Sequence, residues 1–558
     1  MAIIGIDLGT TNSLAACYRD GKTEIIKTSH GESYIPSVVS IDGNGEIIVG
    51  KMAKDRLISH PDVTASEFKR IMGLRQNVVL GERSYSPEEL SSLVLRKIKE
   101  EAEAYLGEPV EEAVISVPAY FDDNCRSATK LAAKLSGIHV ERLVNEPSAA
   151  ALAYQALHGF GDGTFMIIDF GGGTLDVSVV DSFDSVMEIL AVAGDNHLGG
   201  KDFNEAIANY FCADNGLDFN SLSADDKAII YKMAENCKKA LTDTPVSVMI
   251  ANIDGKQYSV TLNNNKLIEI SSSVFERAAS PVRKALHDSR CGIDDIDEII
   301  LVGGSCKMPT VRAFIKKITG KEPCTDIDPD TAIASGAGIF AGIKDRNDKL
   351  RDIILTDICP FSLGTEVLDR ESGELVMDFI INRNSPLPTS REHIYASVRE
   401  GQTKSRFRFY QGESIIPEKN LFLGELEVTY PPAHIHTDTC KARMTYDING
   451  ILVVDIDTLA DKKHYSTVIL SKGNSMSPAE VDAAVKRMEK LKISPADKDE
   501  NRLLIARAER VFEEALPEER EYIAGFLSRF KAALNSQNNH EIRIAFDDLE
   551  AVLDDMDY

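Results

Sequence analysis

Two glycine-rich turns flanked by acidic residues are the features of this sequence best suited to chemistry. One is the run Asp169 to Asp176, which reads DFGGGTLD and lies between the short apolar segments 165–168 and 177–180. Apolar runs of this length around a glycine turn predict a β-hairpin. Consecutive glycines let a ligand approach the backbone, and their N–H groups can form a concave site for phosphate oxygens. An ordinary glycine-rich hairpin explains this run about equally well.

A second copy near the start of the chain favours the phosphate-binding interpretation. Residues 3–13 again read as a strand, an acid (Asp7) and a glycine turn with threonines, followed by a returning strand over 14–18. Such a repeat suggests two similar lobes whose turns face each other. The chain has no GxxxxGK[ST] run and is therefore not a P-loop protein. Acids beside a phosphate require a cation, which we expect to be Mg²⁺ held largely through water.

Three further segments contain groups that could serve a phosphate, although two have a simpler interpretation. Lys69 follows a predicted helix over 61–67 and could reach a phosphate, but from this segment alone a solvated surface lysine is the better interpretation. Glu146 precedes a proline, where it could position water or a hydrated metal, or could simply complement the dipole of a helix start. The glycine turn before residue 201 opens a predicted helix, which is also suited to phosphate.

Two more segments could hold a nucleoside. The helix predicted over 225–241 carries a stripe of acid, base and hydroxyl side chains on one face. The stripe consists of Glu235, Lys238, Lys239 and Thr242. It could hydrogen-bond a ribose and a purine edge, although such stripes are more often solvated surface. Gly303 and Gly304 end a strand predicted from Ile299, and they would let a flat ring approach the backbone.

Composition limits the class of protein. The chain has 558 residues and a net charge of −26, which argues against nucleic acid or an anionic membrane as the main partner. Its nine cysteines are isolated, which fits a reducing compartment. The N-terminus reads as a first strand rather than a signal peptide, and no apolar run approaches transmembrane length. We therefore expect a cytoplasmic protein of about three to four domains.

Taken in order, the motifs resemble those of the DnaK-type seventy-kilodalton heat-shock chaperone family. The matching runs are GIDLGTTNS (5–13), VPAYF (117–121), NEP (145–147), DFGGGT (169–174) and LVGGS (301–305). The resemblance implies an α/β actin-like ATPase domain, with RNase H-like duplicated lobes, over 1–351 and an interdomain linker over 352–358. It further implies a β-sandwich peptide-binding domain over 359–474 and a short α-helical lid over 475–558. ATP or ADP, Mg²⁺ and K⁺ are the implied ligands.

The resemblance also implies roles for individual residues. Lys69, Thr11, Glu146 and Asp169 match the catalytic group, with Lys69 beside the γ-phosphate. Asp7, Asp169 and Asp176 match the acids around hydrated Mg²⁺. The other implied nucleotide-binding positions are Gly9, Thr10, Asn12, Gly171, Gly172, Gly173, Thr174, Gly199, Gly200, Glu235, Lys238, Lys239, Thr242, Gly303, Gly304, Ser305, Lys307 and Asp330.

Other matching positions concern regulation. Pro118 and Arg126 match a switch pair that senses nucleotide, and Arg142 matches an arginine that contacts J-domain partners. Leu355 and Asp357 belong to the implied linker, a run that could also be a minor strand. Two departures from the family pattern stand out: a lysine at 307 replaces the usual arginine, and the segment 243–265 is short. The second leaves open whether a GrpE-type exchange factor is a partner.

The second half of the sequence changes to a period of two. Residues 405–409 alternate strictly, which puts Ser405, Phe407 and Phe409 on one face of a strand, and Asn449-Gly450 predicts a hairpin. The positions that match the family's peptide pocket are Leu368, Tyr395, Val398, Ser405, Phe407 and Phe409, although sandwich core explains them too. A capping box at 477–480 and prolines at 495 and 517 predict helix starts. These features together look most like the short, divergent bacterial HscC subtype.

The function implied is that of an ATP-dependent chaperone and ATPase of protein folding and the stress response. It would bind exposed, extended hydrophobic segments of unfolded proteins with a J-domain partner, and ATP would control release. The alternative is a nucleotide-binding holdase or exchange-factor-like relative with little hydrolysis, which the retained Lys69, Glu146 and Asp169 disfavour. A sugar kinase or an actin-like filament protein is disfavoured by the appended β and helical regions.

Overall fold

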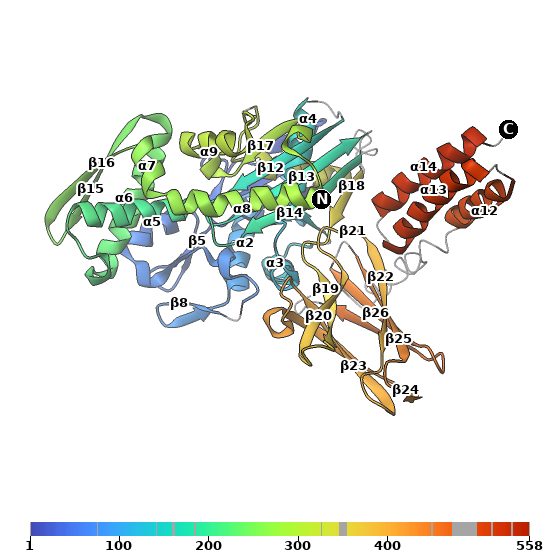
Figure 1. The fold of residues 1–558 in the computed structure, drawn as a ribbon. Helices are drawn as coiled ribbons and strands as arrows, with labels where there is room; N and C mark the ends of the chain where they lie inside the picture. The colour runs from blue at the N-terminus through green and yellow to red at the C-terminus, as the bar shows by residue number, and fades with distance from the viewer. Residues whose placement is uncertain are drawn as a thin grey trace. The chain divides into compact units, whose positions relative to one another are not determined.

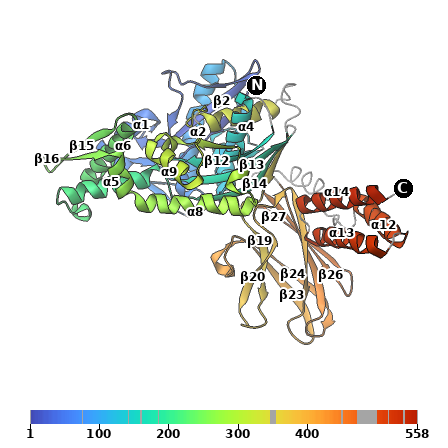
Figure 2. The same cartoon turned by 45° about the horizontal axis from the view of Figure 1, so that its top comes forward.

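The computed structural model describes residues 2–74, 76–140, 142–158, 162–183, 186–324, 326–344, 354–447, 450–470, 499–514, 517–536 and 539–556. Its contacts divide the chain into two compact units, the first ending at Phe361 and the second beginning at Ser362. Figures 1 and 2 label their helices and strands.

The first lobe of the first unit is built on a mixed sheet with the strand order β11-β10-β1-β2-β3. Its strands are β1 (Ala2–Asp7), β2 (Asn12–Arg19), β3 (Lys22–Ile25), β10 (Val110–Val117) and β11 (Leu143–Asn145), with β4 (Ile35–Pro36) paired to β2. A smaller sheet has the order β6-β5-β7, formed by β5 (Val38–Ile41), β6 (Ile47–Val49) and β7 (Thr64–Ser66). The accompanying elements are α1 (Lys51–Ser59), η1 (Pro61–Val63), η2 (Phe68–Ile71), α2 (Pro87–Leu106), α3 (Asp123–Ser136) and the hairpin β8 (Val78–Leu80) and β9 (Arg83–Tyr85).

The second lobe of this unit repeats the plan with the strand order β17-β12-β13-β14-β18. Its strands are β12 (Gly163–Phe170), β13 (Leu175–Phe183), β14 (Val186–Asp195), β17 (Glu298–Val302) and β18 (Ile354–Ile358). Figure 1 shows α8 lying along β13 and β14, which it contacts. The remaining elements are α5 (Gly200–Asp214), η3 (Phe219–Ser221), α6 (Ala224–Asp243), β15 (Val246–Ile253), β16 (Lys256–Asn263), α7 (Asn264–Ile270), α8 (Ser272–Ser289), η4 (Ile293–Asp295), η5 (Gly304–Lys307) and α9 (Pro309–Thr319).

Two small-residue helices join the lobes. Helix α4 (Glu146–His158) and helix α10 (Ala332–Lys344) pack against each other, and one buried core contains residues of both helices and of both large sheets. The helices approach so closely at Gly336 that an added Cβ would overlap the carbonyl oxygen of Ala149. The mixed α/β sheets and their repeated plan are consistent with the predicted actin-like fold.

Local chemistry accounts for helix α3, whereas one helix predicted from the sequence does not form. Helix α3 begins after Asp122, whose side chain accepts a hydrogen bond from the Cys125 N–H, and it ends at Gly137 in the left-handed conformation. The helix predicted over 61–67 is wrong. Only the single turn η1 forms there, because residues 64–66 pair with β5 as the edge strand β7.

The second unit contains two four-stranded antiparallel sheets, with the orders β20-β19-β23-β24 and β22-β25-β26-β27. Their strands are β19 (Leu363–Leu368), β20 (Leu375–Ile381), β22 (Thr389–Ala396), β23 (Gln402–Gln411), β24 (Leu421–Ala433), β25 (Asp438–Tyr446), β26 (Ile451–Thr458) and β27 (His464–Leu470); the short β21 (Pro386–Leu387) and η7 (Pro417–Lys419) lie between them. Phe407 and Phe409 are buried, whereas Arg406 is exposed and Arg408 is partly exposed, so the predicted alternation is confirmed.

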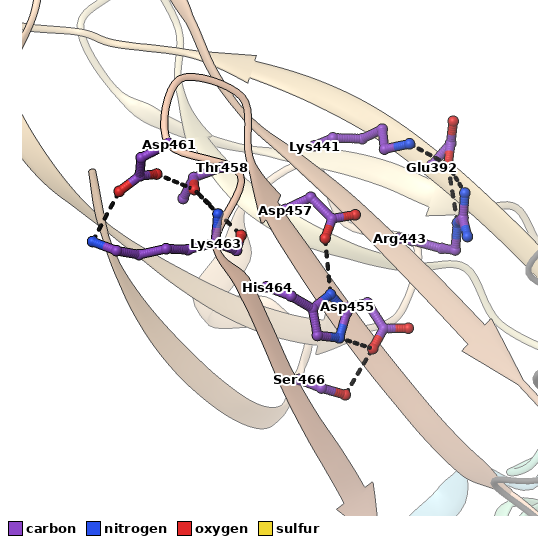
Figure 3. A network of polar contacts seen from close by, with 10 residues as sticks. All are labelled: Glu392, Lys441, Arg443, Asp455, Asp457, Thr458, Asp461, Lys463, His464 and Ser466. Carbon is purple, nitrogen blue, oxygen red and sulfur yellow. Dashed lines mark hydrogen bonds and ion pairs between the residues drawn. The ribbon is translucent and has the colours of Figure 1, made fainter. Parts of the chain in front are cut away.

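One face of the second of these sheets carries a ladder of polar side chains. Glu392, Arg443 and Asp455 are direct cross-strand neighbours, and Arg443 Nε donates to Glu392 at 2.9 Å. Figure 3 shows this pair and, beside it, a second group in which Ser466 Oγ donates to Asp455 at 2.7 Å and His464 Nδ1 lies 2.8 Å from Asp457 Oδ1. Because residues on the alternate positions of β25 and β26 are buried and apolar, the other face of the sheet is its core face.

Three helices form a separate cluster, and one buried apolar core contains residues of all three. They are α12 (Asp499–Glu514), α13 (Pro517–Ser536) and α14 (Asn539–Met556). Helix α13 begins at Pro517 as predicted. The predicted signals at Asn449, 477–480 and Pro495 lie outside the described residues. Within the described part of the chain, no helix is both long and apolar enough to cross a membrane.

Candidate functional site

The two glycine turns predicted to bind phosphate meet each other. The Gly171 N–H donates to Thr174 O at 3.0 Å, which closes the turn between β12 and β13. An added Cβ on Gly172 would lie 2.3 Å from Thr11 Oγ1 of the first turn. The sequence repeat therefore corresponds to two turns that face each other from the two lobes, as expected.

A third glycine turn lies against the second one. The Gly200 N–H donates to Gly171 O at 3.0 Å, and Ser305 Oγ donates to the same oxygen at 2.8 Å. Lys238 Nζ in turn donates to Gly200 O at 2.6 Å. An added Cβ on Gly199 would lie 2.3 Å from Gly173 N, so the two turns touch through bare backbone. Residues from four separate stretches of sequence thus converge beside the predicted phosphate loops.

A buried group of acids surrounds one buried lysine at this place. Lys69 Nζ lies 2.9 Å from Glu146 Oε1, and both side chains are less than a tenth exposed. Asp7, Asp169 and Asp176 are buried as well. The fold explains the gathering: Asp7 ends β1, the two other aspartates face each other across the β12–β13 hairpin, and Glu146 begins α4. Glu146 is therefore a helix-start acid, as one of its two interpretations predicted, and its role toward water or a metal stays a prediction. The surface interpretation of Lys69 is wrong, because this side chain is buried.

Burial dominates the electrostatics of these acids. It raises the pKa of Asp7 to about 7 and that of Asp176 to about 8, and the charge of Glu146 adds to both shifts. The pKa of Asp169 is raised for the same two reasons. Burial alone would lower the pKa of Lys69, but the charges of Glu146 and Asp7 outweigh it, and this pKa is raised. A buried cluster of acids of this kind favours an added cation.

The donor set fits the Mg²⁺ that the sequence predicts. Both carboxylate oxygens of Asp176 are buried and accept no hydrogen bond of good geometry from the described residues, although buried oxygens need a partner. Among the described residues, no three acid, histidine or cysteine side chains converge closely enough to ligate an ion directly. A cation here would therefore take most of its ligands from water and phosphate, as Mg²⁺ prefers.

The residues predicted to form a nucleoside wall lie on α6, on η5 and in the segment before α10. Burial lowers the pKa of Lys238 to about 8. Glu235 and Lys239 form an ion pair one turn apart, and Lys307 pairs with Asp330. Of the other predicted positions, Thr10 is buried, Thr11 and Gly304 are exposed, and Gly9, Asn12, Thr174, Thr242 and Gly303 are partly exposed.

The segment predicted to be the linker forms a strand and makes a specific side-chain contact. Strand β18 runs parallel to β14, with Leu355 opposite Met187. Asn145 Nδ2 donates to Asp357 Oδ1, and Arg126 donates to Asn145 Oδ1 at 2.5 Å. Because Asn145 immediately precedes Glu146, this chain of contacts connects the linker to the buried lysine pair. Of the other predicted regulatory residues, Pro118 is buried after β10, and the Arg142 guanidinium lies 5.7 Å from the Phe340 ring centroid.

Some of the predicted peptide-pocket residues come together in the second unit. The rings of Tyr395 and Phe407 lie 5.3 Å apart, edge to face. Ser405 Oγ lies 2.8 Å from Tyr430 Oη, Phe409 is fully buried, and Leu368 and Val398 are each 42% exposed. The structure places Tyr395 with Phe407 and leaves the two aliphatic side chains in solvent.

Two polar residues beside the aromatic pair escaped sequence analysis. Tyr395 Oη donates to Asp378 Oδ2 at 2.6 Å, and His393 Nδ1 lies 2.9 Å from the same oxygen. This cluster connects β20 of one sheet with β22 of the other. The hydrogen bond to Asp378 raises the pKa of His393, whereas burial of Asp378 is outweighed by its two hydrogen bonds, which lower its pKa. Nothing in the local sequence marks these residues.

Asn145 belongs to the NEP motif, and its hydrogen bond to Asp357 joins residues 212 positions apart in the sequence. In the sequence alone, only its position next to Glu146 points to a functional role for Asn145.

The comparison with protein-family models agrees with this geometry. The model described as Hsp70 protein matches residues 3–79 and 76–557, which is nearly the whole chain. The match includes both glycine turns, the buried lysine pair, the linker strand and the second unit. The chain therefore belongs to the Hsp70 family of seventy-kilodalton heat-shock chaperones.

Proposed function

We propose that this chaperone hydrolyses ATP at the buried lysine site and that the nucleotide controls binding of extended, hydrophobic peptide segments in the second unit. The observation that carries the proposal is the Lys69–Glu146 pair, buried among three aspartates beside two facing glycine turns. A protein that only bound nucleotide would have no need to bury these groups at the cost of raised aspartate pKa values.

Each group has a definite role in this proposal. The N–H groups of the glycine turns bind phosphate oxygens, and Lys69 stabilises the charge that develops on the γ-phosphate. Thr11, exposed at the tip of its turn, orients the attacking water. Asp7, Asp169 and Asp176 would hold hydrated Mg²⁺, which supplies positive charge at the phosphates when bound. Glu146 holds Lys69 in its charged form and in place.

The adenosine would lie against the α6 stripe and the glycines at 303–304. Lys238 is the best placed of these residues, because it already contacts the third glycine turn. Lys307 is engaged with Asp328 and Asp330. Since a lysine lacks the flat face of an arginine, we expect its contribution to adenine binding to be small.

Coupling to peptide binding would run through the linker strand. The contacts from Arg126 through Asn145 to Asp357 support this part of the proposal, because Asn145 directly precedes Glu146 and Asp357 lies on β18. A strand that can pair with β14 or leave it is a two-state element. A J-domain protein would act near Arg142, and we make no assignment of an exchange factor.

The peptide would bind beside the edge-to-face pair of Tyr395 and Phe407. Backbone hydrogen bonds would supply affinity, and the aromatic pair would supply one apolar subsite. The HscC-like character of the chain and its short lid remain part of the proposal.

Single-turnover hydrolysis of ATP tests the catalytic assignment. We expect Lys69→Ala to bind ATP but to lose at least about a hundredfold in the hydrolysis rate. Lys97→Ala, which removes a lysine from a partly exposed helical ion pair in the same lobe, is the matched control and should hydrolyse normally. Equal rates for the wild type and Lys69→Ala would refute the assignment.

A further inference from the structure

A four-residue segment of the first lobe reaches across to the second lobe at the phosphate end of the proposed site. The segment begins at Glu67, directly after β7, and continues into the turn η2. From it, Lys69 pairs with Glu146, and Arg70 lies against the second glycine turn. An added Cβ on Gly173 would lie 3.2 Å from Arg70 Cδ.

The backbone at Glu67 is held in an unusual conformation. Its φ is 64° and its ψ is 14°, which is the left-handed region that a residue with a Cβ rarely adopts. Such strain persists only where surrounding contacts stabilise it, and it is common at functional sites. This conformation lies directly before η2.

The side chain of Glu67 forms an ion pair with Lys201 of the second lobe. Lys201 is the second residue of α5, and its own N–H donates to Gly172 O at 3.1 Å. The lysine is thus attached to the backbone of the phosphate turn itself. Its other acidic neighbours are Glu235 and Asp202. Both have partners already, since Glu235 pairs with Lys239, and Asp202 accepts from the Gly199 N–H and contacts Arg277.

We propose that Glu67 and Lys201 form a clasp between the two lobes that slows release of nucleotide from the site between the glycine turns. The proposal rests on the proposed nucleotide site. Parting the lobes at the phosphate end separates the segment 67–70 from α5 and the second turn, so it must break this ion pair. The clasp therefore stabilises the closed arrangement and acts on the release rate rather than on the chemical step.

The expected effect is modest, because both side chains are partly exposed. Relative exposures of 38% for Lys201 and 27% for Glu67 place the pair in the range where ion pairs are weak and screened by salt. Loss of the pair should raise the dissociation rate of ADP by roughly two- to fivefold.

Stopped-flow release of a fluorescent ADP analogue tests the clasp. We expect Glu67→Gln and Lys201→Met each to speed release, and the double variant to release no faster than the faster single variant, because one interaction is lost in all three. Release from the wild type should also accelerate with added salt more steeply than release from the variants. Lys266→Met, which breaks an ion pair with Glu269 on helix α7 of the second lobe, is the control and should release at the wild-type rate.

The outcomes separate the two levels of the proposal. Normal binding with unchanged release in both single variants, or effects that simply add in the double variant, would overturn the clasp alone. If the wild type binds no ADP, the proposed nucleotide site and the clasp fail together. The unfolding temperature of each variant should match that of the wild type. Equal unfolding temperatures would show that changes in the ADP release rate do not reflect unfolding.

Discussion

Replacing Asn145 with alanine should uncouple nucleotide state from peptide release while leaving the nucleotide site assembled. The amide of Asn145 is the contact between the first lobe and Asp357 of the linker strand: it donates to that carboxylate and accepts from Arg126. Its own backbone lies at the end of β11, paired with Val117. The substitution therefore removes a bridge and leaves the strand in place.

The magnitude follows from the contacts that are lost and kept. A hydrogen bond to a charged group is worth about 1.5–3 kcal/mol when its partner is removed. Asp357 keeps a hydrogen bond from the Ile358 N–H at 2.8 Å, so the lower end of this range applies. A loss of about 1.5 kcal/mol from the docked linker shifts its equilibrium by about tenfold.

The assay is the dissociation rate of a fluorescent peptide with ATP relative to the rate with ADP. We expect Asn145→Ala to lower this ratio by up to about tenfold and Asp357→Asn to lower it less, because asparagine still offers an acceptor to Asn145. Asn77→Ala, which removes an exposed bond to Ser84, is the control. A ratio in Asn145→Ala equal to that of the wild type, or an equal fall in Asn77→Ala, would refute the role of the bridge.

Two further predictions concern the turns and the second unit. Gly199→Ala places a Cβ 2.3 Å from Gly173 N and should abolish ATP binding measured by calorimetry. Gly43→Ala is the control and should bind ATP normally, because no atom lies within 4 Å of the added Cβ. Normal ATP binding by Gly199→Ala would contradict the close approach of the turns. The charged His393–Asp378 pair contributes at most about 1 kcal/mol to the stability of the fold, because both side chains are partly exposed. This contribution is present from above the pKa of Asp378 up to about pH 6.5. It is lost as pH rises through the raised pKa of His393. The unfolding temperature of the wild type should therefore fall toward that of His393→Gln as pH increases. A difference between the two unfolding temperatures that does not change with pH would be evidence against the charged pair.

Local sequence signals predicted the parts of the fold that local chemistry determines. The glycine turns, the turn before α5 and the alternation in β23 all depend on residues that are close in sequence. The same holds for the acids at strand ends, because the end of each strand was visible from its flanking turn. These signals were enough to place Asp7, Asp169 and Asp176 near the phosphate turns.

Contacts between distant segments could not be predicted in this way. The segment 64–66 became a strand because β5 offers it an edge, although Pro61 favoured a helix start. Lys69 looked like a surface residue because nothing near it in sequence reveals Glu146 as its partner. The Glu67–Lys201 pair and the Asp378 cluster each join separate elements, and only the topology brings them together.

The most direct test of the account is single-turnover ATP hydrolysis by the full chain with and without an unfolded peptide. We expect slow basal hydrolysis that the peptide accelerates, a smaller acceleration in Asn145→Ala, and a hydrolysis rate at least about a hundredfold lower in Lys69→Ala. Tight ATP binding with a hydrolysis rate that the peptide leaves unchanged would contradict the coupling between the two units and would favour a nucleotide-binding holdase.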